Sequence, residues 1–367
     1  MMPTIHSGQY IGSYQNVNTG LNSLICLNID SADDGEYEIF STIFAGQGLL
    51  YTASFRITDN NIINHEWIKI TEIDEYERTE TFVTRKDRDH RTYHTADLLV
   101  TNQNGLRINW KLPDGTECQS SGLTNNRDQE STLSSQSLSW DEFRSHVTTH
   151  FAGRKYVFRG QRDHHRLRTS FHRTQRANIG RYFRDNIPAL QRYINAIYPD
   201  FIGAENDYQI LSLLTLLQHH GYPTPILDWT MSPYIAAYFA FFETTETDPG
   251  SVQILAFDRD GYSKDFPQFN NVSDMNLHIS FHDTPTLHNP RCIPQQSVSC
   301  ISTIDDIEKY IEIQESTYKR KYLKAFSIPK SDTKRALNEL HLMGINNATL
   351  FPGLDGICRY MKYEHFG

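Results

Sequence analysis

The stretch that decides the fold is LLTLLQHHGYPTPILDWTMSPYIAAYFAF, residues 213–241, in which polar side chains are packed densely between two strongly apolar segments. Gly221 stands where the first predicted helix should end, because glycine adopts the left-handed conformation of a helix C-terminus without strain. Pro223 and Pro225 then require extended backbone, since proline cannot donate a backbone hydrogen bond. The pattern predicts a polar cluster on a rigid loop between two buried helices.

Helix capping explains only part of this polar cluster. Asp228, Thr230 and Ser232 precede Pro233, and each could cap the helix that begins there. One helix start needs a single cap, and burying the other polar groups beside apolar helices costs free energy unless they bond each other or a ligand. The cluster, with His219 at its upstream end, is therefore a candidate site.

Helical and strand patterns alternate on both sides of this stretch. Ser139 and Glu142 fit a capping box, in which each side chain satisfies a backbone N–H at the start of a helix. Apolar spacing predicts helices at 188–198, 206–220, 233–243 and 331–344 and strands at 155–160, 251–257 and 324–329. We therefore expect an α+β domain over residues 139–367.

Residues 10–123 have a different pattern, with short alternating strands separated by the turn segments SADDG, TDNN, NQNG and PDG. About seven or eight antiparallel strands of this kind predict an all-β barrel or sandwich. Its interior would be lined by alternate residues such as Leu24, Cys26, Ile108 and Trp110.

The polar segment 125–138 has the composition of a flexible linker or an exposed connection. We place the domain boundary there, which gives an N-terminal antiparallel β domain over residues 1–124 and the α+β domain after the linker. A length of 367 residues also favours a multi-domain chain, because each part could bury its own core.

Charge and cysteine content exclude several classes of protein. The net charge of −9 at pH 7 argues against a protein that coats nucleic acid or anionic membrane with its whole surface. The five cysteines are scattered without a C-x-x-C pair, which indicates reduced thiols rather than a zinc site. The N-terminus lacks a signal-peptide pattern, and no apolar run approaches the roughly 18 residues of a membrane helix. We therefore expect a cytoplasmic protein with no membrane partner.

Residues 154–192 carry eleven lysines and arginines against two acidic residues, in a chain that is acidic overall. A solvated face is the ordinary explanation of such a run, and a nucleic-acid-binding surface is the functional one. Arg159 follows the apolar Tyr156, Val157 and Phe158, so it should emerge at a strand end. A planar guanidinium there can hold a pyrophosphate or a carboxylate.

Several catalytic motifs do not occur in the sequence. It contains no G-x-S-x-G, P-loop or G-x-G-x-x-G motif of serine hydrolases, NTPases or dinucleotide-binding folds. His146 and His150 have the i, i+4 spacing of zinc hydrolases without their glutamate, and the adjacent His219 and His220 point in different directions on a helix. We expect no catalytic metal.

Taken in order, a set of motifs in this sequence resembles the FRG domain, a bacterial family named after its Phe-Arg-Gly motif. The resemblance extends over roughly residues 138–362. It rests on Phe158-Arg159-Gly160-Gln161, Gln218-His219-His220-Gly221, Pro223-Thr224, Leu227 to Pro233, Arg291 with Gln295, and Leu350 to Gly356.

The order of these motifs is also similar to that of the ADP-ribosyltransferase fold of the Arg-Ser-Glu type, which implies that NAD is a substrate. Such a site anchors the pyrophosphate with an arginine and stabilises an oxocarbenium-like transition state with a carboxylate or amide. Because Gln295 is uncharged where that fold usually has glutamate, Asp228 would supply the carboxylate. The similarity implies that Arg159, Gln161, Thr230, Ser232 and Arg291 bind NAD and that Asp228, Gln295 and His219 are catalytic.

Three functions from different classes follow from these patterns. The first is an NAD-dependent ADP-ribosyltransferase-like effector whose N-terminal barrel is a sensor or partner-binding module, with bacterial antiviral defence or stress response as the implied context. The second is a non-enzymatic nucleotide- or nucleic-acid-binding module that uses the basic segment 154–192. The third is a metal-independent nuclease or hydrolase in which His219 or His220 acts as general base beside Asp228. The sequence leaves open the acceptor of any transferred group, the ligand of the barrel and the oligomeric state.

Overall fold

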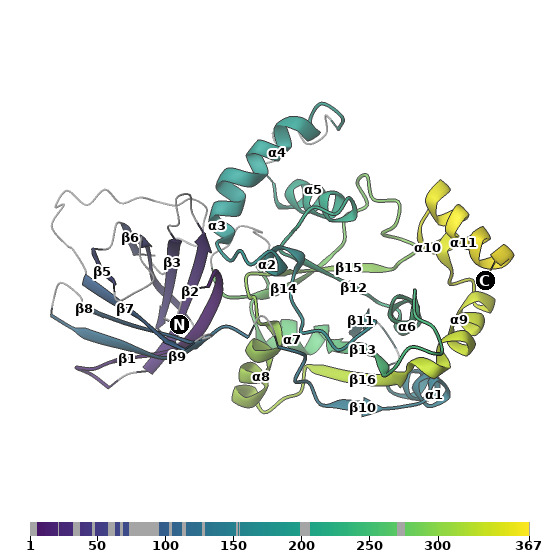
Figure 1. Cartoon of the computed structure of the whole chain (residues 1–367), viewed down its shortest axis with the longest axis horizontal. Helices are drawn as coiled ribbons and strands as arrows, with labels where there is room; N and C mark the ends of the chain where they lie inside the picture. The colour runs from purple at the N-terminus through teal and green to yellow at the C-terminus, as the bar shows by residue number, and fades with distance from the viewer. Residues whose placement is uncertain are drawn as a thin grey trace. The chain divides into compact units, whose positions relative to one another are not determined.

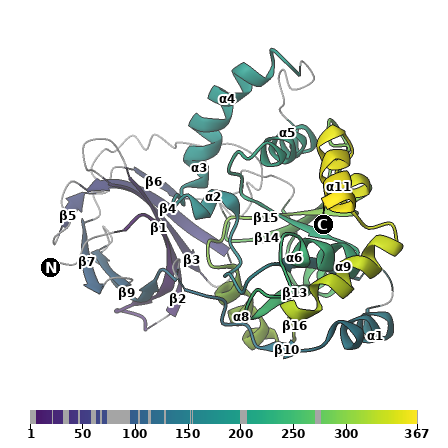
Figure 2. The same ribbon diagram turned by 45° about the vertical axis from the view of Figure 1, so that its right-hand side comes forward.

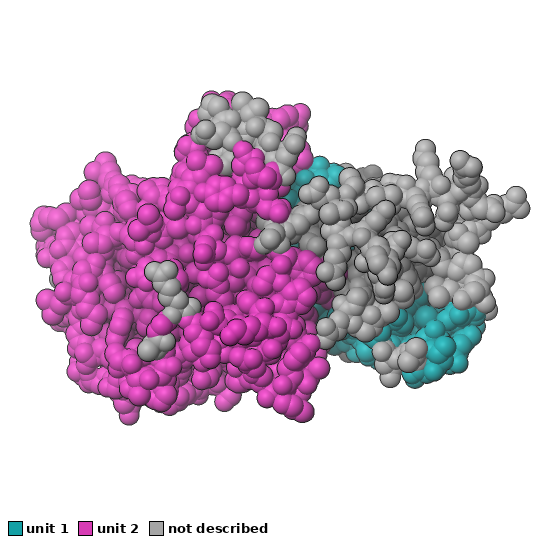
Figure 3. Space-filling view, turned by 180° about the vertical axis from the view of Figure 1, so that it is seen from behind, with its two compact units in different colours: residues 1–127, 171–186 teal, residues 128–170, 187–367 magenta. Residues whose placement is uncertain are grey.

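The computed structural model describes residues 6–20, 22–31, 37–45, 48–57, 63–66, 69–72, 95–102, 105–111, 115–126, 129–151, 153, 155–198, 206–269 and 276–366. By their contacts the residues divide into two compact units, which are coloured in Figure 3. Unit 1 comprises residues 1–127 and 171–186, and unit 2 comprises residues 128–170 and 187–367. The chain therefore contributes to unit 1 twice.

Unit 1 contains an antiparallel sheet that curves into a half-barrel (Figures 1 and 2). Within the described residues the sheet has nine strands in the order β5-β7-β8-β9-β1-β2-β3-β4-β6. The strands are β1 (Gly8–Asn16), β2 (Asn22–Ser31), β3 (Tyr37–Ala45), β4 (Gly48–Ile57), β5 (Ile63–Glu66), β6 (Lys69–Glu72), β7 (Thr95–Asn102), β8 (Gly105–Lys111) and β9 (Glu117–Thr124). The predicted antiparallel β region is confirmed in the form of this half-barrel.

The register of β1 and β2 shows which residues share a face of this sheet. The rings of Tyr14 and Trp110 lie 5.2 Å apart, whereas Cys26 is paired with Ile11. Successive side chains of a strand point to opposite faces, so Ile11 and Cys26 lie on the face opposite to Tyr14 and Trp110. The prediction that Cys26 and Trp110 line one interior is therefore wrong. Residues 25–30 are all buried, so their pattern does not reveal which alternate set faces inward.

Residues 171–186 pack on the half-barrel through a buried carboxylate. The side chain of Asp30 is 1% exposed and accepts hydrogen bonds from the backbone N–H groups of Ala177 at 2.7 Å and Asn178 at 3.3 Å. It also accepts a bond of 3.4 Å from Arg176 Nε. The short helices of this region are α2 (Ser170–Arg173), α3 (Ile179–Arg181) and the π-helix η2 (Tyr182–Asn186).

Unit 2 contains a seven-stranded sheet in the order β10-β16-β13-β11-β12-β15-β14 (Figure 1). β10 is parallel to β16, and the other neighbouring strands are antiparallel. The strands are β10 (Ser135–Ser137), β11 (Tyr156–Gln161), β12 (Ile226–Thr230), β13 (Ser251–Asp258), β14 (Ile279–Asp283), β15 (Ser297–Ser302) and β16 (Leu323–Pro329). Strands and helices are thus mixed along this part of the chain, as predicted.

The helices of unit 2 alternate with these strands. In the part of the chain that the structure describes, none is both long and apolar enough to cross a membrane. They are α1 (Trp140–His150), α4 (Ile187–Ile194), α5 (Asp207–His219), α6 (Pro233–Phe241), α7 (Arg259–Asp265), α8 (Ile307–Tyr318), the 3-10 helix η4 (Lys330–Asp332), α9 (Thr333–Leu342), α10 (Asn347–Leu350) and α11 (Leu354–Phe366).

Local sequence signals fix the ends of three of these helices. The capping box of α1 is confirmed, because the Ser139 side chain accepts from Glu142 N and the Glu142 carboxylate accepts from Ser139 N. Gly221 follows α5 with a φ of 85°, which glycine tolerates and other residues rarely do. Pro233 is in the first turn of α6, where its missing N–H costs no hydrogen bond.

Part of the segment predicted as a linker, residues 125–138, is built into unit 2. Ser135–Ser137 form β10 at the edge of the sheet. Glu308, which is 2% exposed, accepts bonds from Ser131 Oγ at 3.0 Å and from Leu167 N at 2.8 Å. These contacts use polar side chains and backbone, so they leave no apolar pattern in the sequence that would distinguish the segment from a linker.

Residues 226–230 form strand β12 rather than the predicted loop. β12 pairs along its whole length with β15, from Ile226 with Ile301 to Thr230 with Ser297. A five-residue segment between two helices is too short to show a strand pattern, and its pairing with a distant partner decides its conformation. Asp228 is therefore held on a sheet rather than on a loop.

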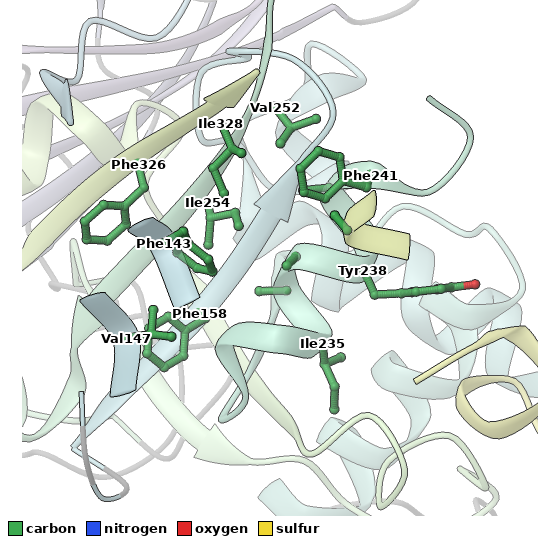
Figure 4. Close-up of a cluster of buried hydrophobic side chains, with 14 of the residues drawn as sticks. Phe143, Val147, Phe158, Ile235, Tyr238, Phe241, Val252, Ile254, Phe326 and Ile328 are labelled. Atoms are coloured by element: carbon green, nitrogen blue, oxygen red, sulfur yellow. The ribbon is translucent and has the colours of Figure 1, made fainter. Parts of the chain in front are cut away.

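Helix α6 packs on β11 through a close backbone contact at Gly160. A Cβ atom at this position would lie 1.9 Å from the Ala236 carbonyl oxygen and 2.7 Å from Ala240 N. The surrounding core joins apolar side chains of α1, β11, α6, β13 and β16 (Figure 4). The glycine of the Phe-Arg-Gly motif therefore sets how closely α6 approaches the sheet.

Replacing Gly160 with alanine should destabilise unit 2 by about 3 kcal/mol, because the added methyl group overlaps the α6 backbone and forces the helix away. Urea unfolding followed by circular dichroism measures this loss. Wild-type stability in Gly160→Ala would contradict the close approach of α6 to β11.

Replacing Asp30 with alanine should destabilise unit 1 by about 3 kcal/mol, because buried N–H donors and part of Arg176 lose their acceptor. Asp185→Ala is the matched control: its carboxylate is 46% exposed and pairs with Arg184 at 2.9 Å, so its loss should cost less than about 1 kcal/mol. Thermal unfolding of both variants checks this difference. Equal unfolding temperatures would show that Asp30 does not hold residues 176–178.

Candidate functional site

A cleft of about 380 Å³ opens in unit 2 where β11 and β12 part. The two strands, both described in full, pair at one position, Phe158 with Thr230, whereas β11 pairs with β13 over six positions. The sheet is therefore split beyond this pair. The cleft is lined by Phe158, Arg159, Gly160, Gln218, His219, Asp228, Trp229, Thr230, Ala236, Phe239, Arg291, Gln295, Ser297 and Phe351.

Arg159 bridges the split between the two strands. Its Nη1 donates a hydrogen bond of 2.5 Å to the backbone carbonyl of Asp228. A guanidinium carries five N–H donors in a rigid plane, and one that lines the cleft suits an anionic ligand. Arg159 thus joins β11 to β12 and also lines the cleft.

The Asp228 carboxylate is held by the helix that precedes it. Gln218 Nε2 donates to Asp228 Oδ2, and Thr224 Oγ1 donates to Gln218 Oε1. Asp228 itself is exposed, although both of its neighbours on β12 are buried. It is the one carboxylate among the described residues that line the cleft.

His219 lines the cleft together with this carboxylate, and its burial favours the neutral imidazole. Burial lowers the pKa of His219 below its ordinary value of 6.5, Asp228 opposes this shift, and the positive charge of Arg291 adds to it. With a pKa below 6.5 the ring is uncharged at pH 7, so one of its nitrogens can accept a hydrogen bond. His220, the next residue, is exposed and does not line the cleft.

Thr230 and Gln295 line the cleft and also form hydrogen bonds with the residues around it. Thr230 Oγ1 donates to the backbone carbonyl of Gln295 at 2.7 Å and accepts from Ser232 N at 3.1 Å. The side-chain amide of Gln295 donates to the carbonyl of Leu350 at 2.9 Å. Both residues line the cleft, and both also hold its walls together.

Two phenylalanines that the sequence analysis did not assign to the site form part of its wall. The guanidinium of Arg291 lies 5.3 Å from the centre of the Phe351 ring, and the rings of Phe239 and Phe351 lie 6.0 Å apart. Phe239 lies on the apolar helix α6, and Phe351 belongs to the motif Leu350 to Gly356. The place of this motif in the order of FRG motifs was the signal that could have identified Phe351.

Two predicted binding residues do not line the cleft. Gln161 Nε2 donates to the carbonyl of His165 at 2.8 Å and to Gln253 Oε1 at 3.2 Å. Ser232 Oγ accepts from Ile235 N at 3.3 Å and so caps α6. Of the eight predicted site residues, the structure gathers the remaining six around one cavity: Arg159, His219, Asp228, Thr230, Arg291 and Gln295.

The described residues hold no group of three or more His, Cys, Asp or Glu side chains that could bind a metal ion. The rings of His146 and His150 stack on each other with centroids 4.3 Å apart. The chemistry offered by the cleft is that of arginine, carboxylate, imidazole and amide groups.

Arginines of the basic segment 154–192 form ion pairs within their own units. Arg166 Nε donates to Asp306 at 2.8 Å, and Arg168 holds Asp305 by two bonds. In unit 1, Arg184 pairs with Asp185. The segment is also divided, because residues 171–186 belong to unit 1 and the rest to unit 2. The charges of these three arginines are thus each paired with an acidic side chain of the same unit.

Comparison with known proteins identifies one family. The family model of the FRG domain matches residues 154–249. No curated protein matches the sequence. Among solved structures, the chain is similar to a redesigned beta barrel, b11L5F_LGL, at 9% identity over 31% of this chain and 86% of that chain, with a TM-score of 0.22. It is also similar to the redesigned beta barrel mFAP1 bound to DFHBI, at 10% identity over 32% of this chain and 94% of that chain, with a TM-score of 0.22.

The matched range is shorter than the resemblance of residues 138–362 in the sequence, but it covers β11, α5, β12 and α6, which supply most of the cleft. The remaining lining residues lie outside the matched range; they are Arg291, Gln295, Ser297 and Phe351. The match supports the presence of an FRG domain in this chain, at residues 154–249.

Proposed function

We propose that the cleft binds NAD and breaks its bond to nicotinamide, as an ADP-ribosyltransferase-like enzyme does. The observation that carries this proposal is the meeting of two arginines, Arg159 and Arg291, with a single carboxylate, Asp228, in one cavity of about 380 Å³. Cavities of this size are typical of small-molecule sites. The two guanidinium groups favour an anionic ligand such as a pyrophosphate.

The proposed reaction assigns one task to each polar group. The C–N bond between ribose and nicotinamide breaks with its electron pair leaving on nicotinamide, and positive charge develops on the ribose. Asp228 stabilises this charge, because a fixed carboxylate in a partly enclosed site acts strongly on a nearby cation. The neutral His219 accepts a hydrogen bond from a ribose hydroxyl or the proton of the attacking nucleophile, which is water or an acceptor group.

The half-barrel is proposed as the sensor or partner-binding module of this enzyme. Residues 171–186 support this proposal, because they lie inside the matched range 154–249 but belong to unit 1. There Asp30 of β2 accepts a hydrogen bond from the backbone of Ala177. A ligand or partner that changes the half-barrel can therefore act on a segment of the FRG match. We propose bacterial defence or stress response as the context, on the family resemblance.

The other two functions have less support. The ion pairs of Arg166, Arg168 and Arg184 reduce the positive charge that a nucleic-acid surface on residues 154–192 would need. A metal-independent hydrolase remains the second candidate, because His219 and Asp228 line the same cleft. Degradation of labelled DNA or RNA without NAD would favour it.

Incubating the full chain with NAD should release free nicotinamide, and Arg159→Ala should lower kcat/KM by at least about 100-fold, because it removes both a phosphate anchor and the bridge to Asp228. Nicotinamide is quantified by liquid chromatography. Arg162→Ala is the matched control: this arginine lies just beyond β11 with its side chain 54% exposed and outside the cleft, and it should leave the rate unchanged. A wild-type chain that releases no nicotinamide, or equal losses in both variants, would refute the proposal.

The rate at saturating NAD should be constant between about pH 8 and pH 7 and should fall only below about pH 6.5, as His219 becomes protonated. Arg291→Gln removes a positive charge that lowers the pKa of His219. That pKa should rise, so the acidic fall in kcat should move to higher pH. Profiles of kcat against pH for the two proteins check this shift, and coinciding profiles would exclude His219 as the titrating group.

A further inference from the structure

We propose that Gln218 and Thr224 are positioning residues that hold the Asp228 carboxylate in one orientation, with Ser170 anchoring Thr224. The relay runs through side chains of unit 2: Thr224 donates to Gln218, and Gln218 donates to Asp228. The proposal concerns the same cleft as the NAD reaction, and its catalytic consequence rests on that proposed function. The relay itself does not.

The chemistry of the three groups permits one arrangement of their hydrogen bonds. An ionised carboxylate only accepts, so the NH₂ group of Gln218 must face Asp228. The amide oxygen of Gln218 then faces Thr224, whose hydroxyl must donate to it. An amide whose oxygen had no donor could rotate and place its oxygen against the carboxylate, where two acceptors would repel. The Thr224 hydroxyl therefore fixes which end of Gln218 meets Asp228.

Thr224 is itself held in place from two directions. It is fully buried, at 0% exposure, and stands between Pro223 and Pro225, whose rings restrict the backbone. Ser170 Oγ accepts from Thr224 N at 2.9 Å and donates to Thr224 O at 3.1 Å. Both backbone groups of Thr224 are thus occupied by one side chain, and its hydroxyl points at Gln218.

The position of Ser170 in the chain links the relay to residues 171–186. Ser170 is the last residue of unit 2 before the chain enters residues 171–186 of unit 1. The hydroxyl that anchors Thr224 therefore belongs to the residue next to the segment that Asp30 holds. The relay therefore starts at the residue that precedes residues 171–186 in the chain and ends at the Asp228 carboxylate.

The test measures the relay without any catalysis. In ¹⁵N-labelled full-length protein, the side-chain NH₂ signals of Gln218 are identified by their loss in Gln218→Glu. Asp228→Asn should displace these signals, because a charged acceptor is replaced by a neutral amide. In a Thr224→Val background the displacement should fall at least about two-fold, because the amide is then free to rotate.

Two further backgrounds make this result specific. Thr224→Ser keeps the hydroxyl and should restore the displacement. Thr215→Val is the matched control. Thr215 is 2% exposed and lies on α5, the helix that carries Gln218, and its hydroxyl donates to Ser212 O at 2.9 Å within that helix. It should give the wild-type displacement. An unchanged displacement in Thr224→Val, or none in the wild-type chain, would overturn the relay, and Thr224→Ala serves as the test variant if valine disturbs folding.

A catalytic readout separates this proposal from the NAD reaction. If the chain cleaves NAD, Thr224→Val should lower kcat about ten-fold and leave the KM for NAD unchanged, since a misplaced carboxylate affects the reacting state and not the arginine anchors. A loss confined to KM would contradict positioning. If the wild-type chain releases no nicotinamide, the proposed function fails, while the Gln218 signals still decide the relay.

Discussion

The parting of β11 and β12 is the constraint on which the site depends. After the pair of Phe158 with Thr230, the two strands no longer form a ladder, and Arg159 spans the opening to the Asp228 carbonyl. The three residues of the Phe-Arg-Gly motif then have separate physical tasks. Phe158 fills the core, Arg159 bridges the split, and Gly160 lets α6 lie against the strand. Loss of any one would change the width or the wall of the cleft.

The split also explains how a polar site can exist in the middle of an apolar sheet. Trp229 packs on Phe257 and Phe281 on one side of β12, while Asp228 stays exposed between two buried neighbours. Burying this carboxylate would cost several kcal/mol without a matched partner. The gap supplies solvent, and the amide of Gln218 supplies the partner.

Local signals predicted much of the fold, and long-range pairing accounts for what they missed. The capping box of Ser139 and the proline of α6 act within one turn of helix, so the sequence shows them directly. The conformation of β12 depends on β15, about seventy residues away. That of residues 131–137 depends on a buried glutamate in α8 and on pairing with β16. For the site, motif order found six cleft residues, but it could not separate a helix cap such as Ser232 from a cleft residue such as Thr230, because both are hydroxyls before Pro233.

The contacts of Gln295 suit an amide better than the glutamate that the ADP-ribosyltransferase resemblance implies at this position. Its amide donates to the carbonyl of Leu350, a residue that is 2% exposed, and its own carbonyl receives the Thr230 hydroxyl. A glutamate at this position could not donate to Leu350 and would place a negative charge against a buried carbonyl oxygen. The amide therefore ties Gln295 to the residue next to Phe351 in the cleft wall, and in the proposed reaction the carboxylate is that of Asp228, which a second glutamine holds. The two glutamines of the cleft thus have different partners. Gln295 bonds a backbone carbonyl of the cleft wall, and Gln218 bonds the Asp228 carboxylate.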